Sequence, residues 1–326
     1  MPPDVFAIVM ATGIVSTAAD DHDYHRIAVV LGVVSLIAFA VLLALGAAGI
    51  VSAPRRAESL LHDPDVALRS FTFVAACAVL GSRFGSEHPW CEWAFGCAAL
   101  IAWLGLAPAA ILDVRSRAVN QLRDHAHGGW LLAAVATQSL AVCAADLAIH
   151  STRRLLIAAS LAWLLGLALY LAVAVLILWR AFAHPFEPDE VGPDSWILMG
   201  GLAIAALASA RIARAAAVVP ATAWLSDSAR VATAVLLVAT SVWIPLLLYA
   251  EVWSVDQRAG SLHYAGVWWA TVFPLGMYAS ASWAGAVELP AHALRTVSLV
   301  FFWIAATVWL LVATGLTHRA LGRLAR

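Results

Sequence analysis

Four histidines lie in pairs in two short polar segments, with a spacing that a metal ion could use. His22 and His25 belong to the segment DDHDYH, and His125 and His127 belong to RDHAHGG. Neither segment supplies the further nitrogen, sulfur or carboxylate ligands that a zinc site needs. We therefore expect these to be solvated loop histidines, and we expect no metal site.

Other groups that do covalent or redox chemistry are equally sparse. The four cysteines lie in or beside apolar stretches and have no CxxC or histidine-paired spacing, which argues against a disulfide scaffold and a zinc site. The sequence has no P-loop, no GxSxG motif and no paired His and Asp on an apolar helix. We expect neither an enzyme nor a nucleotide-driven pump, and no bound cofactor.

Charged residues mark the end of every second apolar stretch. Asp20, Arg83, Asp146, Arg211 and Glu288 follow one another at intervals of 63, 63, 65 and 77 residues. These intervals suggest a repeated pair of helices, although charge at the end of any membrane helix explains them equally well. Should the bundle enclose a path for ions, Arg83 and Arg211 would lie at its outer mouth and attract anions, with Asp146 at a similar level as a pairing partner. The alternative is that these arginines extend to the lipid headgroups.

Small and polar residues interrupt the same alternate stretches. Lipid offers such residues no partners, so these helices belong inside a bundle. No arginine lies in the middle of a stretch, so an anion path would depend on helix dipoles, hydroxyls and amides, with charge at the mouths. The candidates for pore lining, each of which could equally serve helix packing, are Thr12, Gly13, Ser16, Gln138, Ser139 and Gly200.

About ten apolar stretches are long enough to cross a bilayer, which takes about 20 residues. The first begins without a basic segment before it and is followed by acidic residues, so we interpret it as a membrane span and not as a cleaved signal peptide. Because the stretches occupy nearly the whole chain, we expect residues 1–326 to form a single membrane domain. The predicted spans are 3–19, 27–50, 71–80, 93–112, 129–148, 155–179, 196–210, 231–250, 267–287 and 297–316.

The odd-numbered and even-numbered stretches differ in kind. The even ones are longer and more uniformly apolar, which is typical of helices that face lipid or another subunit. This contrast predicts an all-α integral membrane protein in which about five odd helices form an inner ring and five even helices form an outer ring. Other helix bundles share the same contrast.

The overall composition supports a membrane protein and excludes other classes. Of the 326 residues 63% are hydrophobic and only 12% are charged, against about 25% charged in soluble domains. Nineteen basic residues, all arginine, oppose 20 acidic ones, so there is no basic field for nucleic acid. In the ten-span arrangement 11 arginines lie on the side of the termini and 8 on the other, which favours cytoplasmic termini.

Four segments of the odd stretches carry a family signature. Their sequences are PDVFAIVMATGIVS, GGWLLAAVATQSLAV, WILMGGLAIAALA and WWATVFPLGMYASAS, in that order along the chain. Together they resemble the tellurite-resistance/C4-dicarboxylate transporter family, which includes the slow anion channels of plant guard cells. The resemblance implies five helical hairpins in the cell membrane, a central pore lined by the odd helices, cytoplasmic termini and a homotrimer with one pore in each subunit.

The resemblance also implies that an aromatic gate closes the pore. In the family, a phenylalanine on the ninth helix plugs the pore, and the matching residue here is Phe273 in WWATVFPLGMY. Proline removes a backbone hydrogen bond, so Pro274 should kink this helix near Gly276 and turn the Phe273 ring toward the axis. Without the resemblance, the sequence is equally consistent with Phe273 being one more packed aromatic side chain.

These observations favour an integral membrane anion channel or transporter that passes small inorganic anions or C4-dicarboxylates. A proton-coupled C4-dicarboxylate carrier for malate is the alternative, although such a carrier would need an ionisable group near the membrane midplane. A sensor or assembly protein that transports nothing is a third possibility. The residues do not name the anion, and any link to tellurite resistance rests on the family name.

Overall fold

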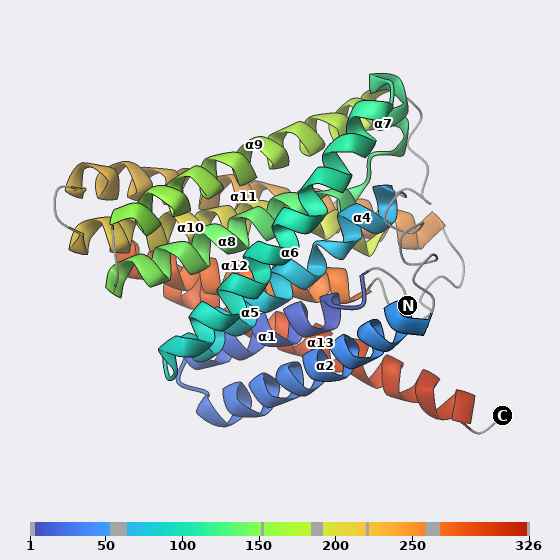
Figure 1. Ribbon diagram of the computed structural model, residues 1–326, viewed down its shortest axis with the longest axis horizontal. Helices are drawn as coiled ribbons and strands as arrows, with labels where there is room; N and C mark the ends of the chain where they lie inside the picture. Colours follow the sequence, from blue (N-terminus) through green and yellow to red (C-terminus); the bar gives the residue numbers. More distant parts are fainter. Residues whose placement is uncertain are drawn as a thin grey trace.

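The computed structural model describes residues 4–52, 64–150, 153–183, 192–219, 222–257 and 268–324, and every regular element in these ranges is a helix (Figure 1). The short elements are α4 (Pro64–Ser70), α7 (Val119–His125) and the 3₁₀ turns η1 (Gly128–Leu131) and η3 (Pro193–Trp196). The long helices are α1 (Ala7–Asp21), α2 (His25–Ser52), α5 (Thr72–Gly85), α6 (Pro89–Ser116), α8 (Leu132–His150), α9 (Arg153–Ala183), α10 (Ile197–Val218), α11 (Ala223–Gln257), α12 (Trp269–Glu288) and α13 (Ala293–Leu324).

Eight helical segments in the described ranges are long and apolar enough to cross a membrane. They comprise α2, α6, α9, α11 and α13, together with α5, α8 and α10 extended by the short elements before them. The two other long helices are α1, which has only 15 residues, and α12, which small and polar residues interrupt. The chain is therefore a multi-pass membrane protein, and a count of ten crossings stays a prediction.

Several predicted span limits were wrong, among them those of the third, seventh and eighth spans; the eighth, predicted as 231–250, is α11 from Ala223 to Gln257. The third span reaches from Val66 to Gly85, because α4 and α5 follow one another with a break at Phe71. The seventh was predicted to end at residue 210, but α10 continues to Val218 and carries Arg211 and Arg214 inside the helix. A helix can continue through two arginines here because both are paired with acids of neighbouring helices.

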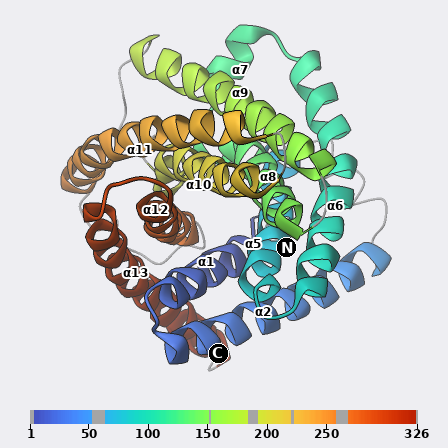
Figure 2. The same ribbon diagram turned by 90° about the vertical axis from the view of Figure 1, so that its left-hand side faces the viewer.

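Helices that follow one another along the chain pack as pairs: α1 with α2, α5 with α6, α8 with α9, α10 with α11 and α12 with α13. The first members also contact one another in the order α1, α5, α8, α10, α12, and α12 contacts α1. Figure 2 shows these first members nearest the middle and their partners around them. We call the two sets the central and the peripheral helices.

Burial follows the same division. In the most apolar part of the α10 segment 94% of the residues are buried, whereas in α6 only 6% are. Glycines allow this burial: a Cβ added at Gly200 would lie 2.9 Å from Pro274 Cγ on α12, and one at Gly201 would lie 2.7 Å from the Tyr170 ring on α9. Such close contacts fix the spacing of α10 from α12 and from α9.

Aromatic side chains of the peripheral helices bond to the central ones. Their N–H and O–H groups lie in an apolar environment where an unpaired donor is costly, so each reaches an acceptor on a neighbouring helix. The bonds, each 2.9 Å long, run from Trp309 Nε1 to Thr12 Oγ1, from Trp103 Nε1 to Thr137 Oγ1, from Trp163 Nε1 to the Ala205 carbonyl and from Tyr170 Oη to the Leu198 carbonyl.

Candidate functional site

Three cavities follow one another between the central helices. The Arg69 cavity, of about 20 Å³, is lined by Asp4, Arg69, Asp194 and Phe273 among others. The central cavity, of about 30 Å³, and the acidic vestibule, of about 470 Å³, share Thr17, Ser82 and Arg211. The two smaller cavities are lined by residues from the segments of all five central helices, so the three spaces mark a path along the axis of the bundle.

The order of the cavities can be followed along α1. Ala7 and Met10 line the Arg69 cavity, Ile14 and Thr17 line the central cavity, and Asp20 lines the acidic vestibule. These residues lie three or four positions apart, which is the spacing of one helix face. One face of α1 therefore accompanies the whole path.

Phe273 lies beside the path, on the wall of one of its cavities. Its side chain is fully buried, and it lines the Arg69 cavity, while Met277 one turn later lines the central cavity. Pro274 lies inside α12, so the carbonyl of Ala270 four residues earlier lacks its usual helical donor. Ala270 also lines the Arg69 cavity. The kink itself, and the role of the ring as a gate, stay predictions.

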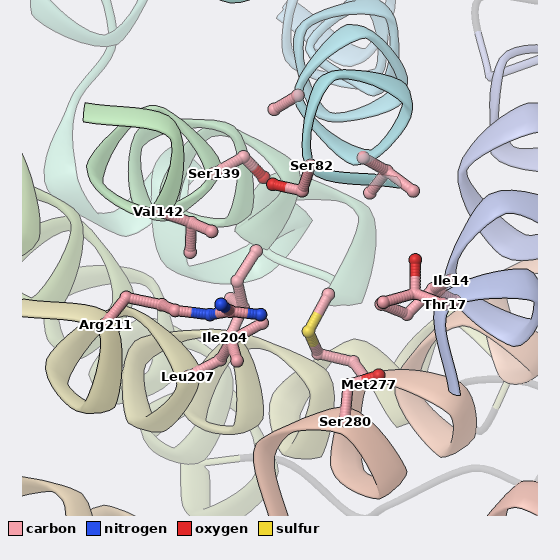
Figure 3. A pocket seen from close by; sticks show the side chains of 12 residues that line it. Ile14, Thr17, Ser82, Ser139, Val142, Ile204, Leu207, Arg211, Met277 and Ser280 are labelled. Carbon is pink, nitrogen blue, oxygen red and sulfur yellow. The ribbon is translucent and has the colours of Figure 1, made fainter. Parts of the chain in front are cut away.

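Each central helix contributes one polar side chain to the central cavity. Figure 3 shows these groups facing the same space, with Arg211 extending from α10. The rest of the wall is apolar and includes Ile204 and Met277. The five polar residues are Thr17 of α1, Ser82 of α5, Ser139 of α8, Arg211 of α10 and Ser280 of α12.

The acidic vestibule contains more acids than bases. Asp20, Asp21, Glu92 and Asp146 line it, against only two arginines. One of these is Arg211, whose Nη1 lies 3.5 Å from Asp146 Oδ1, so the expected pairing of Asp146 with an arginine is seen. The carboxylates outnumber the guanidinium groups at this end of the path.

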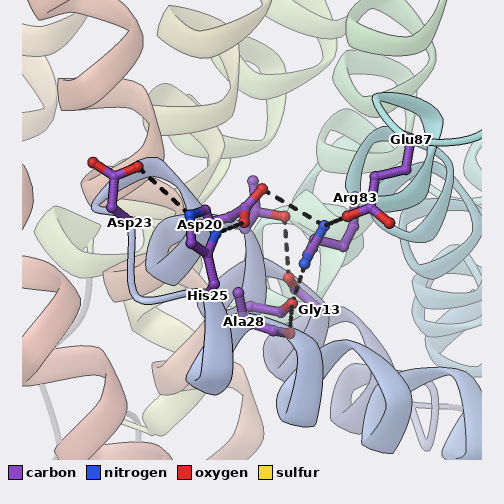
Figure 4. Close-up of polar contacts among 9 residues, drawn as sticks. Gly13, Asp20, Asp23, His25, Ala28, Arg83 and Glu87 are labelled. Carbon is purple, nitrogen blue, oxygen red and sulfur yellow. Dashed lines mark hydrogen bonds and ion pairs between the residues drawn. The ribbon is translucent and has the colours of Figure 1, made fainter.

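The other vestibule arginine, Arg83, belongs to a network of hydrogen bonds and ion pairs between neighbouring helices (Figure 4). Its side chain is only 3% exposed, and Nε donates a 2.8 Å hydrogen bond to Ser16 Oγ. Ser16 in turn donates to the Ala28 carbonyl at 2.7 Å, and Arg83 Nη1 lies 3.6 Å from Asp20 and 3.7 Å from Glu87. Arg83 therefore links α1, α2 and α5 and does not extend to lipid headgroups.

The opposite end of the path has its own polar cluster. His127 Nδ1 and the Gly129 amide lie 2.9 and 3.1 Å from the same oxygen of Asp194, and Arg69 Nη1 lies 3.7 Å from Asp4. The expectation of solvated loop histidines is thus wrong for His127. It is also wrong for the histidine at the end of α1, as described below.

His22 follows α1 directly and packs into the protein. Its Nε2 lies 2.8 Å from Ser298 Oγ, and its ring meets Trp283 edge to face. Burial lowers the pKa of this imidazole below its usual value, against the opposing effect of Asp23. His25 and His125, by contrast, are exposed, although they are the first residue of α2 and the last residue of α7 and do not lie in loops. In the described ranges no group of three or more His, Cys, Asp or Glu side chains is arranged to hold a metal ion.

Most of the residues predicted to line a pore contact neighbouring helices. Thr12 accepts the bond from Trp309, and Ser16 belongs to the Arg83 network. Gln138 Nε2 donates to the Trp163 carbonyl at 3.0 Å. Among the predicted hydroxyl and amide residues, Ser139 lies in the central cavity.

The predicted glycines also lie at helix contacts. A Cβ at Gly13 would lie 2.7 Å from Val79 Cγ1, and one at Gly276 would lie 2.9 Å from Ile14 Cγ2. Gly200 faces Pro274, as described above. Their small size is therefore used for packing, next to residues that line the path.

Sequence reasoning missed Arg69, Thr17, Ser82, Met277 and Ser280. A signal for two of them was present, because Met277 and Ser280 follow Phe273 at four and seven positions, the spacing of one helix face. For the others, the sequence alone carries no sign of which side of the helix faces the axis.

Comparison with known proteins agrees with these features. The family model described as voltage-dependent anion channel matches residues 1–317. Over 162 residues the chain is 33% identical to "Uncharacterized membrane protein Rv1735c" of Mycobacterium tuberculosis strain H37Rv, covering 48% of this chain and 80% of that protein. "Uncharacterized membrane protein MT1776" of strain CDC 1551 matches with the same identity and coverage.

Proposed function

Because the chain belongs to the voltage-dependent anion channel family, we propose that it passes small anions along the axis of its central helices and that Phe273 is the gate. One observation carries the proposal: two separate cavities lined by all five central-helix segments follow one another along the bundle, and the fully buried Phe273 ring lines one of them, one helical turn before Met277 of the other. An apolar ring in a narrow path blocks ions sterically and excludes water.

The proposed architecture extends the observed packing to the membrane. The ten long helices cross the cell membrane as five hairpins, α1 and α12 included, with the central helices around the pore and the peripheral helices toward lipid or other subunits. The exposed apolar side chains of α2, α6, α9, α11 and α13 support this placement. Residues 1–326 then form one domain with cytoplasmic termini, three copies of which associate, each with its own pore.

The arrangement favours a channel or transporter over an enzyme. The path has a large vestibule at one end and hydroxyls, one guanidinium and apolar side chains in the middle. Such a surface replaces part of the hydration shell of an ion without binding it tightly, which conduction requires.

One observation supports a proton-coupled C4-dicarboxylate carrier as the second candidate. Asp146 and Glu92 line the vestibule beside Arg211, and Glu92 Oε1 is buried without a hydrogen-bond partner in the described ranges. Ionisable groups inside a membrane domain are typical of proton pathways. This candidate predicts malate uptake that depends on a proton gradient.

The test is the anion current of purified protein in planar bilayers, wild type beside Phe273→Ala, under chloride, nitrate and malate gradients. Removing the ring joins the cavities, so we expect the current to rise at least about tenfold, or about 1.4 kcal/mol in barrier height. Phe302→Ala is the matched control, because Phe302 is equally buried but packs against Tyr24 and Trp303. An equal rise in both variants, or silence in both, contradicts a Phe273 gate, and malate uptake driven by protons would then favour the carrier.

A further inference from the structure

An apolar groove runs along the outside of the bundle between the peripheral helices α6 and α9. Two cavities form it, of about 260 and 370 Å³, and they share Trp103, Thr137 and Leu165 in their walls. Both α6 and α9 pack against the central helix α8, which forms the floor. Figure 2 shows α6 and α9 as neighbours on the outside, with α8 further in. We call the larger cavity the Arg115 groove, because Arg115 lies at one end of it.

The walls of the Arg115 groove suit an apolar occupant. Its lining is aliphatic or aromatic apart from Thr137 and Arg115, and alanines of α6, α8 and α9 leave room in it. Trp103 Nε1 donates a 2.9 Å hydrogen bond to Thr137 Oγ1, and Thr137 donates to the Ala133 carbonyl at 2.8 Å. These two side chains therefore need no polar partner from an occupant, and open apolar surface of this kind is typical of contact with hydrocarbon.

The length of the groove matches one leaflet of a bilayer. On α6 its wall extends from Trp103 to Arg115, which is roughly 18 Å at about 1.5 Å per residue. One leaflet accounts for half of the hydrocarbon core, or about 15 Å. When Trp103 lies near the middle of the membrane, Arg115 therefore lies at the level of the lipid headgroups.

Arg115 is available to a ligand at this level. Its side chain is exposed and has no hydrogen bond or ion pair with any described residue. Neighbouring arginines differ in this respect. Arg117 Nε lies 3.2 Å from Asp113 Oδ2, and Arg180 Nη1 donates to the Ala126 carbonyl at 3.1 Å. A guanidinium group without a partner is suited to a phosphate, which it can bind with two parallel hydrogen bonds.

We propose that the Arg115 groove is a binding site for an anionic phospholipid, with one acyl chain in the groove and the phosphate at Arg115. A neighbouring subunit would cover the apolar walls but would make no use of the arginine, whereas an anionic lipid uses both. Figure 1 shows α7, which follows this end of α6, at the same end of the molecule as the two termini. With cytoplasmic termini, as proposed above, this is the leaflet that carries the negative surface potential.

The groove lies directly behind the wall of the path. Leu132 and Thr72 line the Arg69 cavity, while the adjacent residues Ala133 and Phe71 line the Arg115 groove. The same turns of α8 and α5 thus have one side toward the path and the other toward the groove. An acyl chain in the groove would support this wall from outside.

The experiment measures lipid binding without flux. Purified protein in detergent micelles is titrated with phosphatidylglycerol or phosphatidylcholine of identical acyl chains, and native mass spectrometry counts the lipids bound to each chain. We expect one phosphatidylglycerol per chain to bind with a dissociation constant about fivefold lower than that of phosphatidylcholine, the effect of one basic residue on an anionic lipid. Equal affinities for the two lipids would overturn the proposal.

Two arginine variants decide whether the phosphate lies at Arg115. We expect Arg115→Gln to raise the dissociation constant for phosphatidylglycerol about fivefold and to leave that for phosphatidylcholine unchanged. Arg117→Gln is the matched control, because it removes the same charge at the same end of the molecule, but Arg117 is paired with Asp113 and does not line the groove. Equal losses in both variants would indicate a general attraction of anions to this surface and would overturn the site.

A variant that fills the groove tests the position of the acyl chain. Ala172 is an exposed residue of α9 that lines the groove, so we expect the ring of Ala172→Phe to raise the dissociation constants of both lipids at least about tenfold. Leu171→Phe is its control, because Leu171 is also exposed on α9 and does not line the groove. Unchanged binding in Ala172→Phe would overturn the proposal. So would a wild-type oligomer without lipid that Ala172→Phe splits into single chains, because the groove would then be an interface between copies.

Discussion

The contact between Gly200 on α10 and Pro274 on α12 makes the position of the Phe273 helix sensitive to a single methyl group. In Gly200→Ala the new Cβ would lie 2.9, 3.0 and 3.2 Å from Cγ, Cβ and Cα of Pro274, whereas ordinary contacts begin at 3.4 Å. The proline ring is rigid and its Cα belongs to the backbone. The two helices must therefore separate by about 0.5 Å at this level.

The energetic cost follows from two opposing effects. Overpacking of a tight contact costs about 1–3 kcal/mol, and alanine in place of glycine stabilises a helix by about 1 kcal/mol. We expect Gly200→Ala to lower the free energy of unfolding by up to about 2 kcal/mol, measured by denaturant titration in mixed micelles. Because Phe273 precedes Pro274, the displacement should also loosen the seal and raise the anion current in planar bilayers above that of the wild type.

Gly105→Ala is the control for this prediction. Gly105 lies on the peripheral helix α6, and a Cβ there would meet no atom within 4 Å, so only the gain in helix propensity applies. We expect this variant to be as stable as the wild type or more so, with an unchanged current. Equal stability of Gly200→Ala and Gly105→Ala would refute the packing argument. Lower stability of Gly200→Ala with an unchanged anion current would refute the connection between this helix contact and the gate.

Two further predictions concern contacts at the C-terminal end of α1. Arg83→Gln removes the buried hydrogen bond to Ser16, whereas Asp20 keeps access to water, so we expect a loss of about 1–3 kcal/mol in unfolding free energy. An unchanged free energy of unfolding would contradict the network. Burial lowers the pKa of His22 in the folded state below its ordinary value of about 6.5. The neutral imidazole therefore contributes fully to the free energy of unfolding above this pH, and the contribution is lost as the pH falls below it, because the unfolded chain takes up a proton first. Unfolding curves between pH 8 and pH 5 should show this loss in the wild type and a smaller one in His22→Asn, and identical pH profiles would contradict it.

The sequence was sufficient to predict the fold class because lipid offers no hydrogen-bond partners to the backbone. Long apolar stretches must be helices, and interrupted ones must find protein partners. It was less informative about where helices end. α10 passes Ala210 because Asp146 and Glu288, far away in the chain, neutralise Arg211 and Arg214. No local pattern reveals such a pairing.

The side chains that face the path were harder to predict than the helices that carry them. Ser16 and Thr17 are adjacent in α1, yet Ser16 belongs to the Arg83 network and Thr17 lines the central cavity. Polarity shows that a helix avoids lipid, but both of its sides then contact protein. The direction of each hydroxyl depends on which neighbour is closest, as the bond from Trp309 to Thr12 illustrates.

The aromatic bonds between peripheral and central helices also constrain how the path opens. Trp163 and Tyr170 both bond from α9 to the α10 backbone, at Ala205 and at Leu198, seven residues apart. Two attachments at different heights resist rotation of α10 about its own axis, because in the membrane interior the freed donors would find no water. Opening by a twist of the central helices would break such bonds. A change of rotamer at one side chain would leave these bonds intact. The helices can therefore stay fixed while a single side chain moves.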